Sequence, residues 1–216
     1  LAMRKLNNGK AADGQGMTLE LIKYGPIELH EKLITLYNEM LGRGEIETTW
    51  RHTIFRMIEK KGDLEDPANY RPIAILAIFY KIFAKMLYHR LEAKLDREQT
   101  EDQFGFRSSF RIEEAIGIVE NVISATNEYN LPLWIASLDL RKTFDRIEYD
   151  ALFAALREQG LDHAEVALLL DMYSSQNGSV CNSKTFQIER GVKQGDSLSS
   201  LIFNAATESI FRHWNL

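Results

Sequence analysis

Apolar residues recur with the spacing of helices over much of the chain. A stripe with a 3.6-residue period starts at Pro26 and ends at Gly42 and Gly44, which predicts a helix between a proline start and a glycine stop. Asp162 and Glu165 form a capping-box pattern that predicts a helix running through Tyr173. The same periodicity predicts further helices over residues 75–95, 112–129 and 150–159 and from about residue 197 onward.

Strand patterns are fewer and shorter. Trp50 to Ile58 alternates in part and is closed by the turn-forming stretch 60–63, which predicts a strand. Asn177-Gly178 is typical of a hairpin and predicts paired short strands up to Ile188. Because strands and helices mix without regular alternation, the predicted class is α+β and rich in helix.

The stretch from Leu133 to Asp145 suggests the first hypothesis about the chemistry of the chain. Leu133, Trp134 and Ile135 predict a buried strand that delivers the carboxylate of Asp139. A carboxylate at the end of a buried strand is costly unless it is compensated, and a divalent cation is the usual compensation. We therefore predict a metal-dependent phosphoryl-transfer site, with a helix cap or loop carboxylate as the alternative for Asp139. For Asp145, we favour the N-cap of the following helix.

A row of basic residues leaves two interpretations open. Lys81, Lys85 and His89 recur every four positions of the predicted helix 75–95, so they share one face. That face is either a solvated stripe or a surface that contacts a nucleic-acid backbone.

Composition and charge limit the class of protein and its cellular location. With 45% apolar residues the chain can fill a core, and it shows no secretion signal and no apolar run long enough to span a membrane. A single cysteine, Cys181, excludes an internal disulfide framework and suggests a nuclear or cytoplasmic location. The formal charge is −5, but residues 51–111 hold 12 Lys/Arg against 9 Asp/Glu, so the middle is mildly basic.

Four ordered motifs carry a family resemblance. They are NYRPIAILAIFYKIFAKMLYHRL (69–91), DQFGFR (102–107), SLDLRKTFDRIEYDAL (137–152) and GVKQGDSLSSLIFN (191–204). In this order and spacing the chain resembles the reverse transcriptase of LINE-type (non-LTR) retrotransposons. The resemblance covers nearly the whole chain and implies fingers-like residues 1–132 followed by a partial palm, residues 133–216.

The resemblance implies an RNA-directed DNA polymerase that works on an RNA template and a DNA primer with Mg²⁺. Asp139 matches the first metal-binding aspartate of the family, with the carbonyl of Leu140 as an auxiliary ligand. Phe144 matches the aromatic that packs under the nucleotide sugar, although without the family it reads as a core residue.

Other matched positions are expected at the nucleotide. Gln194 and Gly195 match the loop that contacts the incoming nucleotide, although Gln-Gly before a helix is also an ordinary turn. Arg71 and Arg107 match basic positions that could reach a triphosphate or the template backbone through bidentate phosphate contacts, or else serve as surface ion-pair partners.

The family completes its site with an aromatic-x-Asp-Asp turn, and no Asp-Asp pair occurs in the 216 residues. We therefore expect a fragment that ends before that motif and is inactive by itself. The rival hypothesis is a non-catalytic structural or interaction subunit derived from a reverse transcriptase, with protein partners covering the truncated palm.

Overall fold

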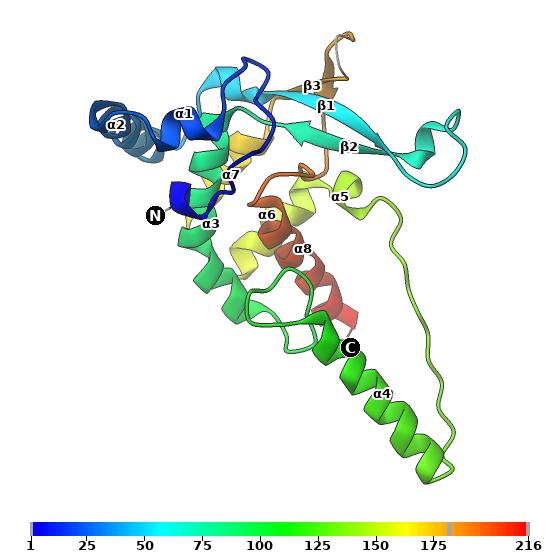
Figure 1. Ribbon diagram of the computed structural model, residues 1–216. Helices are drawn as coiled ribbons and strands as arrows, with labels where there is room; N and C mark the ends of the chain where they lie inside the picture. Colours follow the sequence, from blue (N-terminus) through cyan, green and yellow to red (C-terminus); the bar gives the residue numbers. More distant parts are fainter. Residues whose placement is uncertain (1, 181–182, 215–216) are drawn as a thin grey trace.

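The computed structural model describes residues 2–180 and 183–214 and has an α+β fold, as predicted (Figure 1). Its helices are α1 (Leu19–Lys23), α2 (Ile27–Arg43), α3 (Ile78–Glu98), α4 (Ile112–Glu128), α5 (Thr143–Arg146), α6 (Tyr149–Glu158), α7 (His163–Tyr173) and α8 (Ser199–Trp214). Short 3-10 helices cover Ala2–Lys5, Thr48–Arg51 and Pro67–Asn69. The strands β1 (His52–Glu59), β2 (Tyr70–Ile75), β3 (Gln176–Val180) and β4 (Phe186–Ile188) form one sheet.

Two helix boundaries follow from the predicted local signals. Gly44 ends α2 in the left-handed conformation (φ 71°) and donates its N–H to the Met40 carbonyl at 2.9 Å. At α7 the Asp162 carboxylate accepts from the Glu165 N–H at 2.9 Å, and the Glu165 carboxylate accepts from the Asp162 N–H at 3.1 Å. The capping box is therefore confirmed.

The sheet has the order β2-β1-β3-β4, with β1 parallel to β3 and the outer pairs antiparallel. The strand patterns did not predict β2, which contains Pro72. Proline cannot donate to a ladder and is tolerated in an edge strand, which is where β2 lies. The pairing of β1 with β3 joins the residue ranges 1–132 and 133–216 in one sheet, so the boundary between them stays a prediction.

The structure corrects the hairpin turn that was predicted at Asn177-Gly178. The two short strands do pair, but both residues lie inside β3, where Gly178 faces Phe186. A Cβ atom on Gly178 would lie 2.7 Å from the Phe55 ring and 2.8 Å from the Phe186 ring. This glycine therefore permits close aromatic packing and does not form a turn.

The predicted buried strand at Leu133–Ile135 is wrong. Residues 131–140 form an exposed, extended segment that runs from the far end of α4 to α5, and Trp134 is 93% exposed (Figure 1). Apolar and β-branched residues favour a strand only where a neighbouring strand pairs with it. None of the strands described in the structure pairs with this segment.

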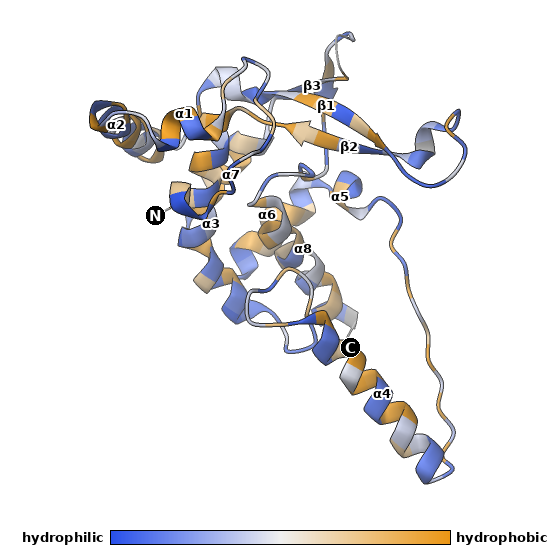
Figure 2. Cartoon of the chain, viewed as in Figure 1, coloured by the Kyte–Doolittle hydropathy of each residue, from blue (hydrophilic) through white to orange (hydrophobic). Residues whose placement is uncertain are grey.

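Helix α4 was predicted correctly, but all of its residues escape burial. Its isoleucine and valine side chains, from Ile112 to Ile123, are between 37% and 62% exposed. Figure 2 shows these apolar positions along the helix, which extends away from the rest of the chain. Helix α4 and residues 131–140 thus expose an unusual amount of apolar surface.

The core lies between α2, α3, α6, α7 and α8. At its centre the ring of Phe83 packs 5.3 Å from Tyr37 and 6.2 Å from Trp50, measured between ring centroids. The basic row on α3 is not a solvated stripe, because Lys81 and Lys85 are half-buried and Lys85 lies 3.9 Å above the Tyr88 ring. Cys181 falls outside the described residues. No helix in the described ranges is long and apolar enough to cross a membrane.

Candidate functional site

The GVKQGD loop, residues 191–196, is fixed to the short helix α5. The Gly191 N–H donates to the Ile147 carbonyl at 2.8 Å, and the Val192 N–H donates to the Phe144 carbonyl at 2.7 Å. Gly191 has φ +88°, and a Cβ there would lie 2.8 Å from the Phe144 carbonyl oxygen. Only glycine fits this close approach of two backbones.

Gln194 joins three elements at one point. Its carbonyl accepts from the Ala74 N–H on β2 at 2.9 Å, and its amide Nε2 donates to the Asp145 carboxylate on α5 at 3.2 Å. Gln194 and Asp145 line a cavity of about 190 Å³ together with Arg71 and Lys142. The structure therefore brings together Gln194 and Arg71, which the sequence placed at the nucleotide, and adds Asp145. The predicted N-cap role of Asp145 is wrong, because it lies within α5 and helix α6 is preceded by Glu148.

Gly195 follows in the same loop and is exposed. Its φ is +107°, and a Cβ there would lie 3.3 Å from the Ala74 carbonyl oxygen. The missing side chain at this position lets the loop pack closely against β2.

Phe144 directly precedes Asp145, which lines the cavity, but its own side chain packs toward the core. Its ring stacks on Phe203 with a centroid distance of 4.5 Å and meets Phe106 edge-on at 5.8 Å. This position agrees with a core residue and also with an aromatic platform below the nucleotide sugar. The contact between Phe144 and a sugar therefore stays a prediction.

Arg107 belongs to a different set of contacts. Its guanidinium forms an ion pair with Asp96 at 2.8 Å and donates to the Thr100 carbonyl at 2.7 Å. The side chain is only 9% exposed and stacks over the Phe110 ring. This geometry favours the ion-pair interpretation, and nucleotide contact by Arg107 stays a prediction.

The predicted metal ligands do not form a site in the structure as described. Asp139 and Leu140 lie on the exposed segment, and Leu140 borders a separate groove between α6 and α8. Among the described residues, no group of three or more His, Cys, Asp or Glu side chains could hold a metal ion. A single exposed carboxylate does not fit the octahedral oxygen coordination of Mg²⁺.

A buried polar network that the sequence did not predict lies behind the loop. Asp196 accepts from the Tyr80 hydroxyl at 2.9 Å and from the Leu198 N–H at 3.2 Å, and burial raises the pKa of its carboxyl. Lys193 is 5% exposed and lies 4.6 Å from the centre of the Tyr80 ring. Burial lowers the pKa of Lys193 to about 8, and Asp196 opposes that shift.

This shift makes stability depend on pH. Because the pKa of Lys193 falls from 10.5 to about 8 on folding, the unfolded chain binds more protons between these values. The contribution of Lys193 to the free energy of unfolding should therefore increase as pH rises from 8 to 10.5. We expect Lys193→Met to lack that gain. Urea unfolding of both proteins across this range measures the difference, and parallel pH profiles would contradict it.

Comparison with known proteins gives the class of protein. Residues 58–216 match the family model described as "Reverse transcriptase (RNA-dependent DNA polymerase)". The match covers well over half of the chain, and it includes β2, the GVKQGD loop and α5. The chain belongs to the reverse transcriptase family.

The relatives narrow the class to retrotransposons, as the motifs predicted. The chain is 28% identical over 173 residues to the "Retrovirus-related Pol polyprotein from type-1 retrotransposable element R2" of Popillia japonica, covering 78% of this chain and 24% of that protein. It is 28% identical over 213 residues to the "Transposon TX1 uncharacterized 149 kDa protein" of Xenopus laevis, covering 96% and 16%. It is 27% identical over 207 residues to the "Probable RNA-directed DNA polymerase from transposon X-element" of Drosophila melanogaster, covering 91% and 22%. The chain thus spans less than a quarter of the length of these relatives.

Proposed function

We propose that the chain supplies the nucleotide-contacting part of an RNA-directed DNA polymerase. The observation that carries this proposal is the cavity of about 190 Å³ where Gln194, Asp145 and Arg71 meet. The bond to Asp145 orients the Gln194 amide, and Arg71 is exposed on β2 at the same cavity. A guanidinium suits bidentate contact with phosphate oxygens, and the amide can accept or donate at a sugar or base.

The substrates proposed for the whole protein are an RNA template, a DNA primer and deoxynucleoside triphosphates. Support comes from the matched family, whose description names RNA-dependent DNA synthesis. For the reaction, Mg²⁺ is the proposed ion and Asp139 with the Leu140 carbonyl the proposed ligands. In the described structure these two residues do not by themselves complete a metal site, so the ion needs further oxygen ligands.

Replacement of Gln194 tests the proposal. In the whole protein that carries this sequence, Gln194→Leu should raise the KM for deoxynucleotides about tenfold, as expected for loss of one or two hydrogen bonds. Leucine retains the volume but removes the amide. RNA-templated primer extension at varied nucleotide concentration measures the change.

The matched control is Gln15→Leu, because Gln15 is exposed and lies outside this cavity. Its KM should equal that of the unmodified protein. An unchanged KM in Gln194→Leu, with both variants folded, would contradict a nucleotide-contacting role for the cavity.

A second candidate function, protein binding, is favoured by the apolar surface of α4 and residues 131–140. The helix buries none of its residues, and Trp134 is 93% exposed. We infer that helix α4 and residues 131–140 contact protein, either another part of the whole protein or a separate chain. Hydrogen exchange of α4 in the whole protein tests it, since covered amides exchange more slowly.

A further inference from the structure

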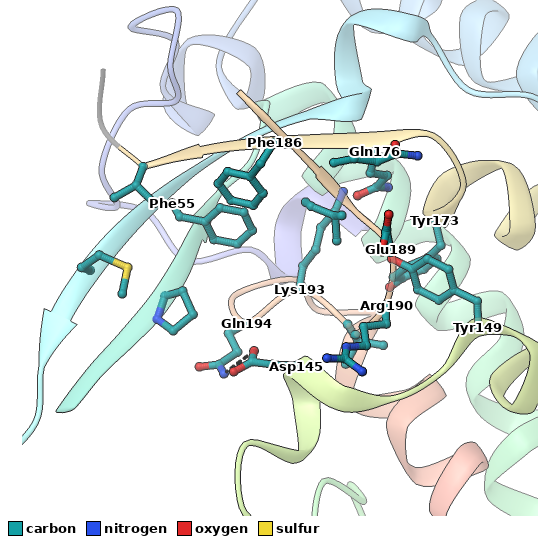
Figure 3. A pocket seen from close by; sticks show the side chains of 17 residues that line it. Phe55, Asp145, Tyr149, Tyr173, Gln176, Phe186, Glu189, Arg190, Lys193 and Gln194 are labelled. Atoms are coloured by element: carbon teal, nitrogen blue, oxygen red, sulfur yellow. Dashed lines mark hydrogen bonds between the residues drawn. The ribbon is translucent and has the colours of Figure 1, made fainter. Parts of the chain in front are cut away.

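An open groove of about 720 Å³ lies between helices α6 and α8. As far as the chain is described, its lining residues all differ from those of the two cavities at the GVKQGD loop, the larger of which Figure 3 shows. The Gln159 amide donates to the Ala205 carbonyl at 2.6 Å, so the two walls of the groove are held together. Small side chains leave the space between the helices, namely Ala151, Ala154 and Ala155 on α6 and Ala206 on α8.

The exposed segment 131–140 starts at this groove and leaves it uncovered. Leu140 borders the groove, and its carbonyl accepts from the Thr143 hydroxyl at 2.7 Å. From there the segment runs free to the far end of α4 (Figure 1). Asn130 and Lys142 flank it with φ of 51° and 54°, which is uncommon for residues other than glycine. The chain therefore turns sharply at both ends of the segment, and changes at these two residues would swing it.

Alternate residues of the segment differ in chemistry. One row is apolar throughout and consists of Trp134, Ala136, Leu138 and Leu140. The other row ends in the polar residues Ser137 and Asp139. Because successive side chains of an extended backbone point to opposite sides, the two rows lie on opposite faces. In the apolar row, Trp134 is 93% and Leu138 is 77% exposed, and residues 131–138 carry no charged side chain. This row is therefore suited to an apolar groove.

The lengths of the groove and of the apolar row agree. The lining residues of α6 extend from Glu148, just before the helix, to Glu158 at its end, which is about 15 Å at the helical rise. An extended chain from Leu140 to Ala136 covers about 13 Å. If the segment follows α6, Trp134 lies just beyond the end of that helix, over the C-terminal part of α8.

We propose that residues 133–140 form a strap that closes over the groove between α6 and α8. In the closed form the row that ends at Leu140 faces the alanines, and Ser137 and Asp139 face water. The structure shows the open form. Burial of the apolar row favours closure, and the peptide groups at the edges of the strap can stay hydrated. The inference rests on the second candidate function, protein contact by this segment, and names the surface that it contacts.

Paired cysteines test this proposal in the whole protein that carries this sequence. Leu138→Cys is combined with Ala151→Cys or with Ala154→Cys, two exposed positions of the groove. Peptide mass spectrometry after mild oxidation identifies the cross-link and separates it from any bond to Cys181. The matched control is Ser137→Cys with the same partners, because Ser137 is the exposed neighbour on the other row. With one of the partners, Leu138→Cys should give at least about tenfold more cross-link, since a disulfide requires Cβ atoms about 4 Å apart.

Labelling by a maleimide gives a second measurement that needs no partner cysteine. Closure covers residue 138 and leaves residue 137 in water. Leu138→Cys should therefore react about tenfold more slowly than Ser137→Cys when the closed form dominates. Circular dichroism and thermal unfolding establish that each variant folds.

A strap that never closes would give a different pattern. Equal cross-linking of the two positions, equal labelling of them, or no cross-link from Leu138→Cys with either partner would overturn the proposal. Hydrogen exchange separates this result from failure of the second candidate function. Slow exchange of α4 and residues 131–140 without the cross-link would overturn this inference alone, because another surface then covers them. Rapid exchange without the cross-link would overturn the second candidate function as well.

Discussion

Gly191→Ala is expected to lower the free energy of unfolding by about 3 kcal/mol and to displace the loop that carries Gln194. The φ of +88° is strained for any residue with a Cβ. In addition, the new Cβ would lie 2.8 Å from the Phe144 carbonyl oxygen and 2.9 Å from the Asp145 Cα. These are backbone atoms that cannot move aside as a flexible side chain can. Urea unfolding measures the loss.

Gly44→Ala is the matched control, because Gly44 also has a positive φ, +71°, but no atom within 4 Å of the added Cβ. Its cost should be about 1 kcal/mol, the backbone strain alone. The difference between the two variants isolates the contact between the loop and α5. Equal costs would show that the loop can move away from α5 freely.

Phe83→Ala is expected to cost about 3–5 kcal/mol, a large share of the stability of a domain. Phe83 is 0% exposed and packs against Tyr37 and Trp50, so the loss of its ring leaves a cavity between helices α2 and α3 and the start of the sheet. The rings around it hold hydrogen bonds of their own, such as that from the Tyr37 hydroxyl to the Phe79 carbonyl, so they cannot simply close the gap.

The graded series Phe83→Leu and Phe83→Ala separates lost contacts from cavity formation, because leucine fills part of the space. Phe186→Ala, at a side chain 45% exposed, should cost only about 1 kcal/mol. Chemical denaturation provides all three values. A cost below that of Phe186→Ala would mean that the core collapses around the missing ring.

Local signals in the sequence predicted the helices well. Gly44 and the pair Asp162 and Glu165 act on atoms a few residues away, so their effect does not depend on the rest of the fold. Strands depend on distant partners. Leu133 to Ile135 has a strand composition and forms none, whereas β2 contains Pro72 and forms one because it lies at the sheet edge.

In the candidate site, too, residues in contiguous motifs were predicted, whereas contacts between distant residues were not. Gln194 was found from a contiguous motif, and the structure places Arg71, which was matched in an earlier motif, at the same cavity. Asp145 was assigned to a helix cap because its partner, Gln194, lies 49 residues later. The buried Asp196 gave no signal, since its partner Tyr80 lies 116 residues earlier in the chain, and only the fold brings the two together.

The parallel pairing of β1 with β3 has a consequence for how the chain folds as it is made. His52 pairs with Asn177, about 125 residues later. A ribosome adding about 5–20 residues per second needs roughly 6 to 25 seconds to supply that partner. Meanwhile the β1–β2 hairpin has an unpaired inner edge, which is prone to pair with other chains. Slower initiation of translation should therefore raise the yield of correctly folded protein. A chaperone that covers the free edge of the β1–β2 hairpin during synthesis should have the same effect.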